Sequence, residues 1–420
     1  MNIEPIIKLK NKKKYISQVS IYDFINLHNK PAIIFNAKRI NDLSLYFVDL
    51  LKKSYNNSEV HYAIKACYTP AVIKIMEKNG VKFEIMSDFE YKILKKLNVQ
   101  SQDIIFNGPG KTYELLEKTI NDNIEIINVD SESELRDIIS IAKKYNKIVK
   151  VGIRIQPDVP NDSFLIRGEK LGMDQKSGQA EEIIKKYKDN KWIDFCGIQF
   201  HSFINQKNGK NIINALIEVI NFVQNMNLKY NFKPTYFDIG GGLSTIENWN
   251  INEFEDYISQ LGIQLKKLEW NPKLIVEPGR FLVSDCAIAV AKIIRKKING
   301  NSKWLIVNAN SNMLIPLATA DFKVESINYN FDEVSNYNVG DCLCSASGTI
   351  ERNVILPNNI EENDYVIIKN VGAYTINLSE PFAEPILPIY IVDGEDIKLI
   401  HKGVTIDEMI NYFLGCDYNE

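Results

Sequence analysis

The sequence has few of the residues that hold metal ions or form disulfide bonds. Its 420 residues include six cysteines and four histidines. No two cysteines have the C-x-x-C spacing of a zinc site, and six thiols over this length are too sparse for a disulfide framework. No two histidines stand at the spacing of metal ligands. The sequence therefore predicts no metal centre.

Net charge of one sign and long apolar runs are also missing. Fifty Lys and Arg against 53 Asp and Glu give a formal net charge of −3, so there is no basic field that would attract a nucleic acid. The richest apolar stretch, residues 281–294, is interrupted by Ser284, Asp285 and Lys292 and is shorter than the ~20 residues that cross a bilayer. The N-terminal lysines follow a short apolar stretch instead of preceding one, unlike a secretory signal. We therefore expect a cytoplasmic protein without nucleic-acid or membrane partners.

The sequence is rich in short β-branched and apolar runs that alternate with amphipathic segments. Runs that are apolar on both faces are typical of parallel strands covered by helices. Eight of them recur from residue 61 onward, which predicts an α/β fold, specifically a (β/α)₈ barrel of the TIM type. The runs lie at residues 61–66, 82–87, 103–108, 124–129, 147–155, 195–202, 236–241 and 274–279.

The pattern changes after residue 285. Runs such as KWLIVN, DYVIIK and LPIYIV are separated by Asn, Gly and Pro turns, with few helices until the chain's end, which indicates a mainly β domain. The apolar segment at residues 31–35 precedes the first barrel strand and is assigned to the same domain. The predicted domains are a barrel over 36–284 and a sandwich-like or barrel-like β domain over 1–35 and 285–420.

Chemically useful residues stand at the predicted strand ends, where barrel enzymes carry their sites. They are Lys65, His201, Gly240 to Gly242, and the pair Glu277 and Arg280. Taken singly, each has an ordinary explanation: a solvated charge, a satisfied histidine, a tight turn or a structural ion pair. Together they comprise an amine, a flat ring, a glycine cradle for an anion, an arginine and a carboxylate, which is the set that pyridoxal phosphate needs.

These residues lie in motifs that resemble the fold-type III pyridoxal-phosphate decarboxylases, the group of diaminopimelate, ornithine and arginine decarboxylases, which share the alanine racemase-like architecture. The resemblance runs from about residue 30 to 400. The motifs are YAIKA, GIQFH, DIGGGL, EPGR and VGAYT, in that order along the chain.

The resemblance implies a role for each motif. Lys65 would bind the cofactor covalently, His201 would stack on its ring, and Gly240 to Gly242 would hold its phosphate. Glu277 would pair with the pyridine nitrogen, where alanine racemases are known for an arginine, and so favours decarboxylation. The remaining cofactor and substrate contacts would come from Arg280, Tyr374 and Glu84, the last as the counterpart of a second-strand aspartate.

The resemblance further implies a homodimer in which one protomer's β domain completes the partner's site with a proton-donating cysteine. Cys344 is the candidate and Cys342 the alternative, while an ordinary strand cysteine is the plain interpretation. The family usually has acidic residues after this cysteine to hold a distal amine, but here Ser345 follows and no acid occurs before Glu351. After His201, Phe203, Ile204 and Asn205 replace the family's usual glycine-serine pair. Asn205 or Ser202 is a second candidate for substrate contact.

The sequence thus predicts a carboxy-lyase that uses pyridoxal phosphate to release CO₂ from the α-carboxylate of an amino acid. A buried distal ammonium without a carboxylate partner would cost several kcal/mol. We therefore expect a modified or conjugated amino acid, as in siderophore or other specialised-metabolite biosynthesis. Diaminopimelate decarboxylation is the main alternative. The lower-ranked alternatives are an ornithine or lysine decarboxylase, a racemase and a non-catalytic regulator.

Overall fold

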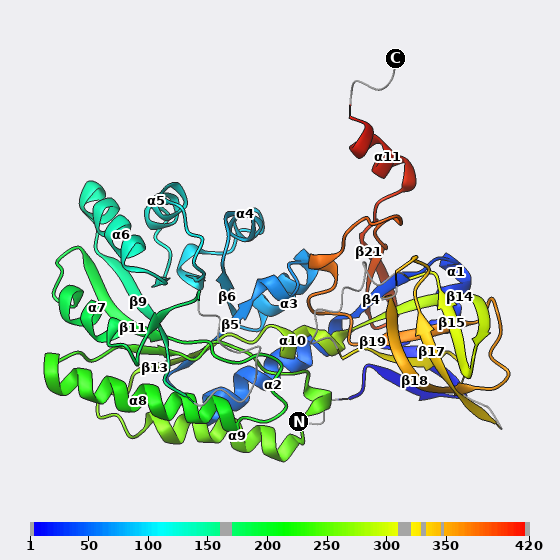
Figure 1. The fold of residues 1–420 in the computed structure, drawn as a ribbon, viewed down its shortest axis with the longest axis horizontal. Helices are drawn as coiled ribbons and strands as arrows, with labels where there is room; N and C mark the ends of the chain where they lie inside the picture. The colour runs from blue at the N-terminus through cyan, green and yellow to red at the C-terminus, as the bar shows by residue number, and fades with distance from the viewer. Residues whose placement is uncertain (1–3, 160–169, 310–320, 329–332, 346–347, 416–420) are drawn as a thin grey trace. The chain divides into compact units, whose positions relative to one another are not determined.

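The computed structural model describes residues 4–159, 170–309, 321–328, 333–345 and 348–415 (Figure 1). The chain divides into two compact units, one of residues 44–281 and one of residues 1–43 with 282–420. The predicted boundaries at residues 36 and 284 differ from this division because helices α2 (Ala37–Ser54) and α10 (Arg280–Val283) each run across it. Each unit is described in turn.

The first unit is a closed barrel of eight parallel strands, which confirms the predicted fold class. Each strand pairs with the next along the chain, and the last pairs with the first through Leu274 and Ser58, so the sheet closes. The strands are β5 (Ser58–Ala63), β6 (Lys82–Ile85), β7 (Ile104–Phe106), β8 (Ile126–Val129), β9 (Val149–Gln156), β11 (Ile193–Gln199), β12 (Tyr236–Asp238) and β13 (Lys273–Val276). A two-residue strand, β10 (Met173–Asp174), extends the sheet beside β9.

Helices cover the outside of the barrel strands (Figure 1). Several begin at a hydroxyl cap: Ser87 accepts the Glu90 N–H, Thr112 the Leu115 N–H, and Ser131 the Glu134 N–H. Such caps satisfy backbone donors that the first helical turn leaves unpaired. Besides α2, the helices are α3 (Pro70–Lys78), α4 (Asp88–Lys96), α5 (Tyr113–Asn121), α6 (Glu132–Tyr145), α7 (Gln179–Tyr187), α8 (Lys210–Tyr230) and α9 (Ile251–Leu265).

The barrel interior is filled around Tyr236. A Cβ on Gly152 would lie 1.9 Å from the Tyr236 hydroxyl, and one on Gly197 would lie 1.8 Å from its ring. These two glycines therefore make room for the tyrosine. At the strand starts, the Lys82 ammonium lies 3.2 Å from Glu59 and 3.1 Å from Glu125, so ion pairs connect the start of β6 to β5 and to the residue before β8.

The second unit is mainly β. Its large sheet has the order β18-β17-β15-β14-β4-β20-β21, and β19 links β14 to β16. Strand β4 (Ala32–Asn36), which carries the 31–35 segment, lies between β14 and β20. The other strands are β14 (Ala287–Asn299), β15 (Ser302–Val307), β16 (Lys323–Ser326), β17 (Val334–Gly340), β18 (Thr349–Pro357), β19 (Tyr365–Lys369), β20 (Ile389–Asp393) and β21 (Asp396–His401).

Smaller elements complete this unit. A three-stranded sheet of β1 (Ile7–Lys10), β2 (Lys13–Ile16) and β3 (Val19–Ser20) precedes helix α1 (Ile21–His28), and helix α11 (Ile406–Leu414) stands near the C-terminus. The buried Arg39 and Asp285 form an ion pair. No helix within the described ranges is long and apolar enough to span a membrane.

Candidate active site

Lys65 lies directly after the first barrel strand. The sequence pattern placed it within that strand, but β5 ends at Ala63 and residues 64–66 form a short 3₁₀ turn. The Lys65 ammonium hydrogen-bonds to the Glu84 carboxylate, and its side chain keeps 30% of its surface exposed while Glu84 is buried. The turn thus presents an accessible amine beside a buried carboxylate, a partnership that the sequence did not predict.

His201 follows strand β11 and carries a neutral ring. Burial, followed by the positive charges of Arg154 and Lys65, lowers the pKa of His201 to about 3. Its Nδ1 accepts the backbone N–H of Gly241 at 3.1 Å, so the proton of the neutral imidazole is on Nε2. A flat, uncharged ring at this strand end is suited to stacking on an aromatic group.

The glycine loop at residues 240–242 passes against the other site residues. Gly240 and Gly242 have φ values of 65° and 85°, which favour glycine. A Cβ on Gly240 would lie 2.5 Å from His201 Nδ1, one on Gly241 2.1 Å from the Glu277 carbonyl oxygen, and one on Gly242 2.2 Å from the Phe203 carbonyl oxygen. The loop therefore packs so closely against its neighbours that a side chain at any of the three positions would clash.

Glu277 stands at the end of the last barrel strand in a buried polar cluster. Burial, with the negative charge of Glu84, raises the pKa of its carboxyl group, while hydrogen bonds from Asp238 and Asn107 act in the opposite direction. Burial and the neighbouring Glu277 raise the pKa of Asp238 further, well above its ordinary value. Burial therefore disfavours a negative charge on both carboxyl groups at once.

The other predicted site residues lie on both units. Arg280 is the first residue of α10 and is partly buried, and Asn205 lies in the loop after β11 with a φ of 51°. Tyr374, Cys344 and Ser345 belong to the β unit, and both Cys344 and Ser345 are exposed. Residues 346 and 347, which belong to the segment where the family usually has acidic residues, lie outside the described residues.

The sequence reasoning missed four buried polar residues of the barrel. They share a position at or near a strand end, and in the sequence they stand within or beside the motifs DIGG, FNGPG and NVDS. These residues are Asn107, Asn128, Tyr236 and Asp238. For Asn128, the available signal was an amide in an otherwise apolar strand.

The fold and site together define a barrel enzyme of the pyridoxal-phosphate class. An amine, a neutral aromatic ring, a close-packed glycine loop and a buried carboxylate lie at the C-terminal ends of the strands, and this set is suited to the aldehyde, ring, phosphate and ring nitrogen of the cofactor. Residues 47–284 match the family model described as pyridoxal-dependent decarboxylase, pyridoxal binding domain. The chain therefore belongs to the pyridoxal-dependent decarboxylases, which are carboxy-lyases.

Individual relatives cover almost the whole chain. A diaminopimelate decarboxylase of Aquifex aeolicus is 23% identical over 97% of both chains. One of Methanocaldococcus jannaschii is 27% identical over 93% of both chains. A crystal structure of the diaminopimelate decarboxylase from M. jannaschii in complex with L-lysine matches with a TM-score of 0.87 at 24% identity, over 97% of each chain.

Proposed function

We propose that this protein is a diaminopimelate decarboxylase. The observation that carries the proposal is the name shared by both relatives, each of which aligns over more than nine-tenths of the two chains. This preference replaces our expectation of a conjugated amino acid from specialised metabolism, for which the relatives' names offer no support. A cytoplasmic location belongs to the same proposal.

The site residues take the following roles in the proposal. When bound, pyridoxal phosphate supplies an electron-withdrawing ring that stabilises the electrons left on Cα as CO₂ departs. Lys65 attaches the cofactor, and Glu84 orients the lysine amine through their hydrogen bond. His201 offers its neutral face to the ring, and Glu277 accepts the hydrogen bond of the ring nitrogen.

The phosphate and substrate contacts complete the assignment. The glycine loop holds the phosphate, with Arg280 and Tyr374 as its further contacts. Asn205 and Ser345 are the proposed substrate contacts. A homodimer would let Cys344 of one protomer return the proton to Cα in the other.

A conjugated amino acid remains the second candidate substrate because of one observation. Glu351, the first acid after Cys344, accepts a hydrogen bond from the backbone N–H of Val324, so its carboxylate already has a partner within its own unit. Residues 345–350, between Cys344 and Glu351, contain no acid, which weighs against a substrate that has only an ammonium at its far end.

The test is CO₂ release from a panel of amino acids by the purified, cofactor-loaded protein. The panel contains meso-diaminopimelate, lysine, ornithine, arginine and a citryl-conjugated lysine, with Lys65→Ala as the inactive control. We expect selective turnover of meso-diaminopimelate. Turnover of the conjugated amino acid in preference to diaminopimelate would support the second candidate. Formation of an amino acid deuterated at Cα, without release of CO₂, would identify a racemase.

A further inference from the structure

A chain of buried hydrogen bonds runs through the barrel interior to Glu277. The Tyr236 hydroxyl donates to Asn128 Oδ1 at 2.6 Å, Asn128 Nδ2 donates to Asn107 Oδ1 at 2.9 Å, and Asn107 Nδ2 donates to Glu277 Oε1. The four residues come from strands β12, β8, the end of β7 and the end of β13. None has more than 5% of its surface exposed, so water does not compete for these bonds.

We call this chain of hydrogen bonds from Tyr236 through Asn128 and Asn107 to Glu277 the relay. Each of its donors points toward Glu277. Burial raises the pKa of Tyr236 well above its ordinary value, so the phenol stays protonated and donates a hydrogen bond. Asn128 Nδ2 also donates to Asp238 Oδ2 at 3.2 Å. Turning the Asn128 amide around would remove the donations of Nδ2 to Asn107 and Asp238 and would place the nitrogen against the phenol that donates to the amide oxygen. Each amide therefore has one satisfied orientation, and the last donor faces Glu277.

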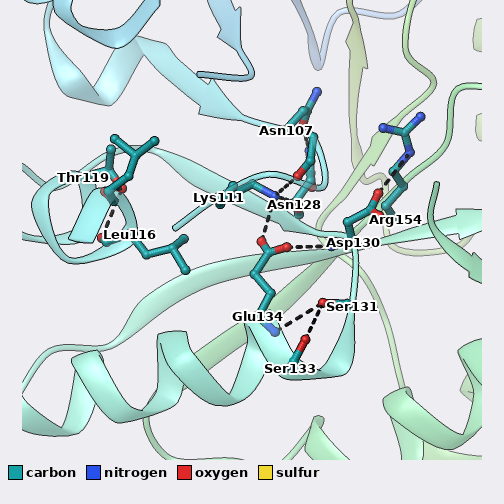
Figure 2. A network of polar contacts seen from close by, with 12 residues as sticks. Asn107, Lys111, Leu116, Thr119, Asn128, Asp130, Ser131, Ser133, Glu134 and Arg154 are labelled. Carbon is teal, nitrogen blue, oxygen red and sulfur yellow. Dashed lines mark hydrogen bonds and ion pairs between the residues drawn. The ribbon is translucent and has the colours of Figure 1, made fainter. Parts of the chain in front are cut away.

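The backbone that carries the two asparagines is held in place by Lys111. Its ammonium is buried and donates to the carbonyl oxygens of Gly108 at 2.6 Å and Asn128 at 2.9 Å, and to Glu134 at 2.7 Å (Figure 2). Glu134 in turn accepts the backbone N–H of Asp130. These contacts connect the loop after β7 to strand β8, so the spacing between the two asparagines is constrained at both ends.

We propose that Tyr236, Asn128 and Asn107 are positioning residues that hold Glu277 in one orientation, as a hydrogen-bond acceptor for the cofactor's ring nitrogen. The inference rests on the proposed role of Glu277. Its physical basis is that a buried carboxylate without hydrogen-bond donors takes up a proton. The protonated oxygen can then no longer accept a hydrogen bond from the ring nitrogen. The relay supplies a donor to Glu277 whose direction is set at its far end, where the Tyr236 hydroxyl donates to Asn128.

The experiment uses apoprotein reconstituted with pyridoxal phosphate that carries ¹⁵N in the ring, and it measures the ¹⁵N chemical shift and the cofactor dissociation constant without any substrate. Tyr236→Phe removes the first donor but keeps the ring that fills the space beside Gly152 and Gly197. Asn107→Asp keeps the side-chain volume but replaces the last donor with an acceptor. Glu277→Gln gives the reference value, the ¹⁵N chemical shift of a ring nitrogen that has no carboxylate beside it.

We expect both relay variants to move the ¹⁵N signal toward that of Glu277→Gln, Asn107→Asp more than Tyr236→Phe. We expect about tenfold weaker cofactor binding, since a hydrogen bond to a charged group contributes ~1.5 kcal/mol. Tyr91→Phe is the matched control, because Tyr91 is a buried barrel-unit tyrosine whose hydroxyl donates to Asp122 outside the relay. It should leave both readouts unchanged.

Thermal melting of each apoprotein by circular dichroism identifies the variants that fold. Lower melting temperatures in the relay variants with an unchanged ¹⁵N shift would show a merely structural role and overturn the proposal. An unchanged shift in Glu277→Gln would remove the basis for the relay and overturn it as well. Because no substrate is present, a failure to decarboxylate diaminopimelate affects neither readout.

Discussion

Replacing Lys111 by methionine tests how the barrel tolerates a buried charge. The ammonium makes three hydrogen bonds, and its partner Glu134 is also buried. Methionine keeps most of the side-chain volume, so the loss is mainly electrostatic. Removing one partner of a buried pair costs roughly 3–5 kcal/mol because the other charge is left uncompensated. At roughly 2–4 °C per kcal/mol for a domain of this size, the melting temperature should fall by roughly 6–20 °C.

The pH dependence of this loss has a defined sign. Burial raises the pKa of Glu134, with the Lys111 charge acting against it. Without Lys111, the folded-state pKa of Glu134 rises further above its unfolded value. The penalty is therefore full at a pH above the folded pKa and is relieved as the pH falls through it, when the carboxyl group takes up a proton. Lys111→Met should be less destabilised, relative to wild type, at pH 5 than at pH 8.

The assay is urea unfolding followed by circular dichroism at both pH values, with Lys111→Met/Glu134→Leu as the matched double variant. Removing both charges leaves no unpaired ion, so the double variant should be more stable than Lys111→Met alone. A single variant that loses less than about 1 kcal/mol would refute the reasoning, because that is the range of an exposed ion pair. So would a double variant less stable than the single one.

Three further predictions concern the site and the barrel. Lys65→Ala should remove the yellow absorbance that the wild-type protein shows with pyridoxal phosphate; a colourless wild type would contradict the cofactor role of Lys65. Gly241→Ala should weaken cofactor binding by about tenfold or more, measured by absorbance titration, because its Cβ would lie 2.1 Å from the Glu277 carbonyl oxygen and the loop would have to move. In the barrel, hydrogen bonds from His61 and Lys273 lower the pKa of Glu59 despite the opposing effect of its burial. Its contribution to stability is present above the unfolded pKa of ~4.3 and is lost as the pH falls through the lower folded pKa. Glu59→Gln should therefore be less stable than wild type in urea at pH 7, and equally stable in strong acid.

The barrel could be predicted because its strands carry a local signal. Each of the eight strands is apolar on both faces and is followed by an amphipathic helix, so the pattern is visible in a window of roughly 20 residues. The end of β5 was misplaced by this same rule, since Ile64 and Ala66 are buried and apolar yet lie in a 3₁₀ turn. The preference for a conjugated substrate came from the residues after Cys344, a local reading that the relatives' shared name outweighs.

The sequence by itself determined the fold class and the candidate site residues, because strand periodicity and motifs such as EPGR depend on residues close together in the chain. Only the tertiary structure decided which of these residues meet. Glu84 lies 19 residues from Lys65, and Asn107 lies 170 residues from Glu277. Closure of the barrel brings them within hydrogen-bonding distance, and burial then decides their charge. The lowered pKa of His201, the raised pKa of Asp238 and the direction of the relay all follow from that burial, which no local sequence pattern predicts.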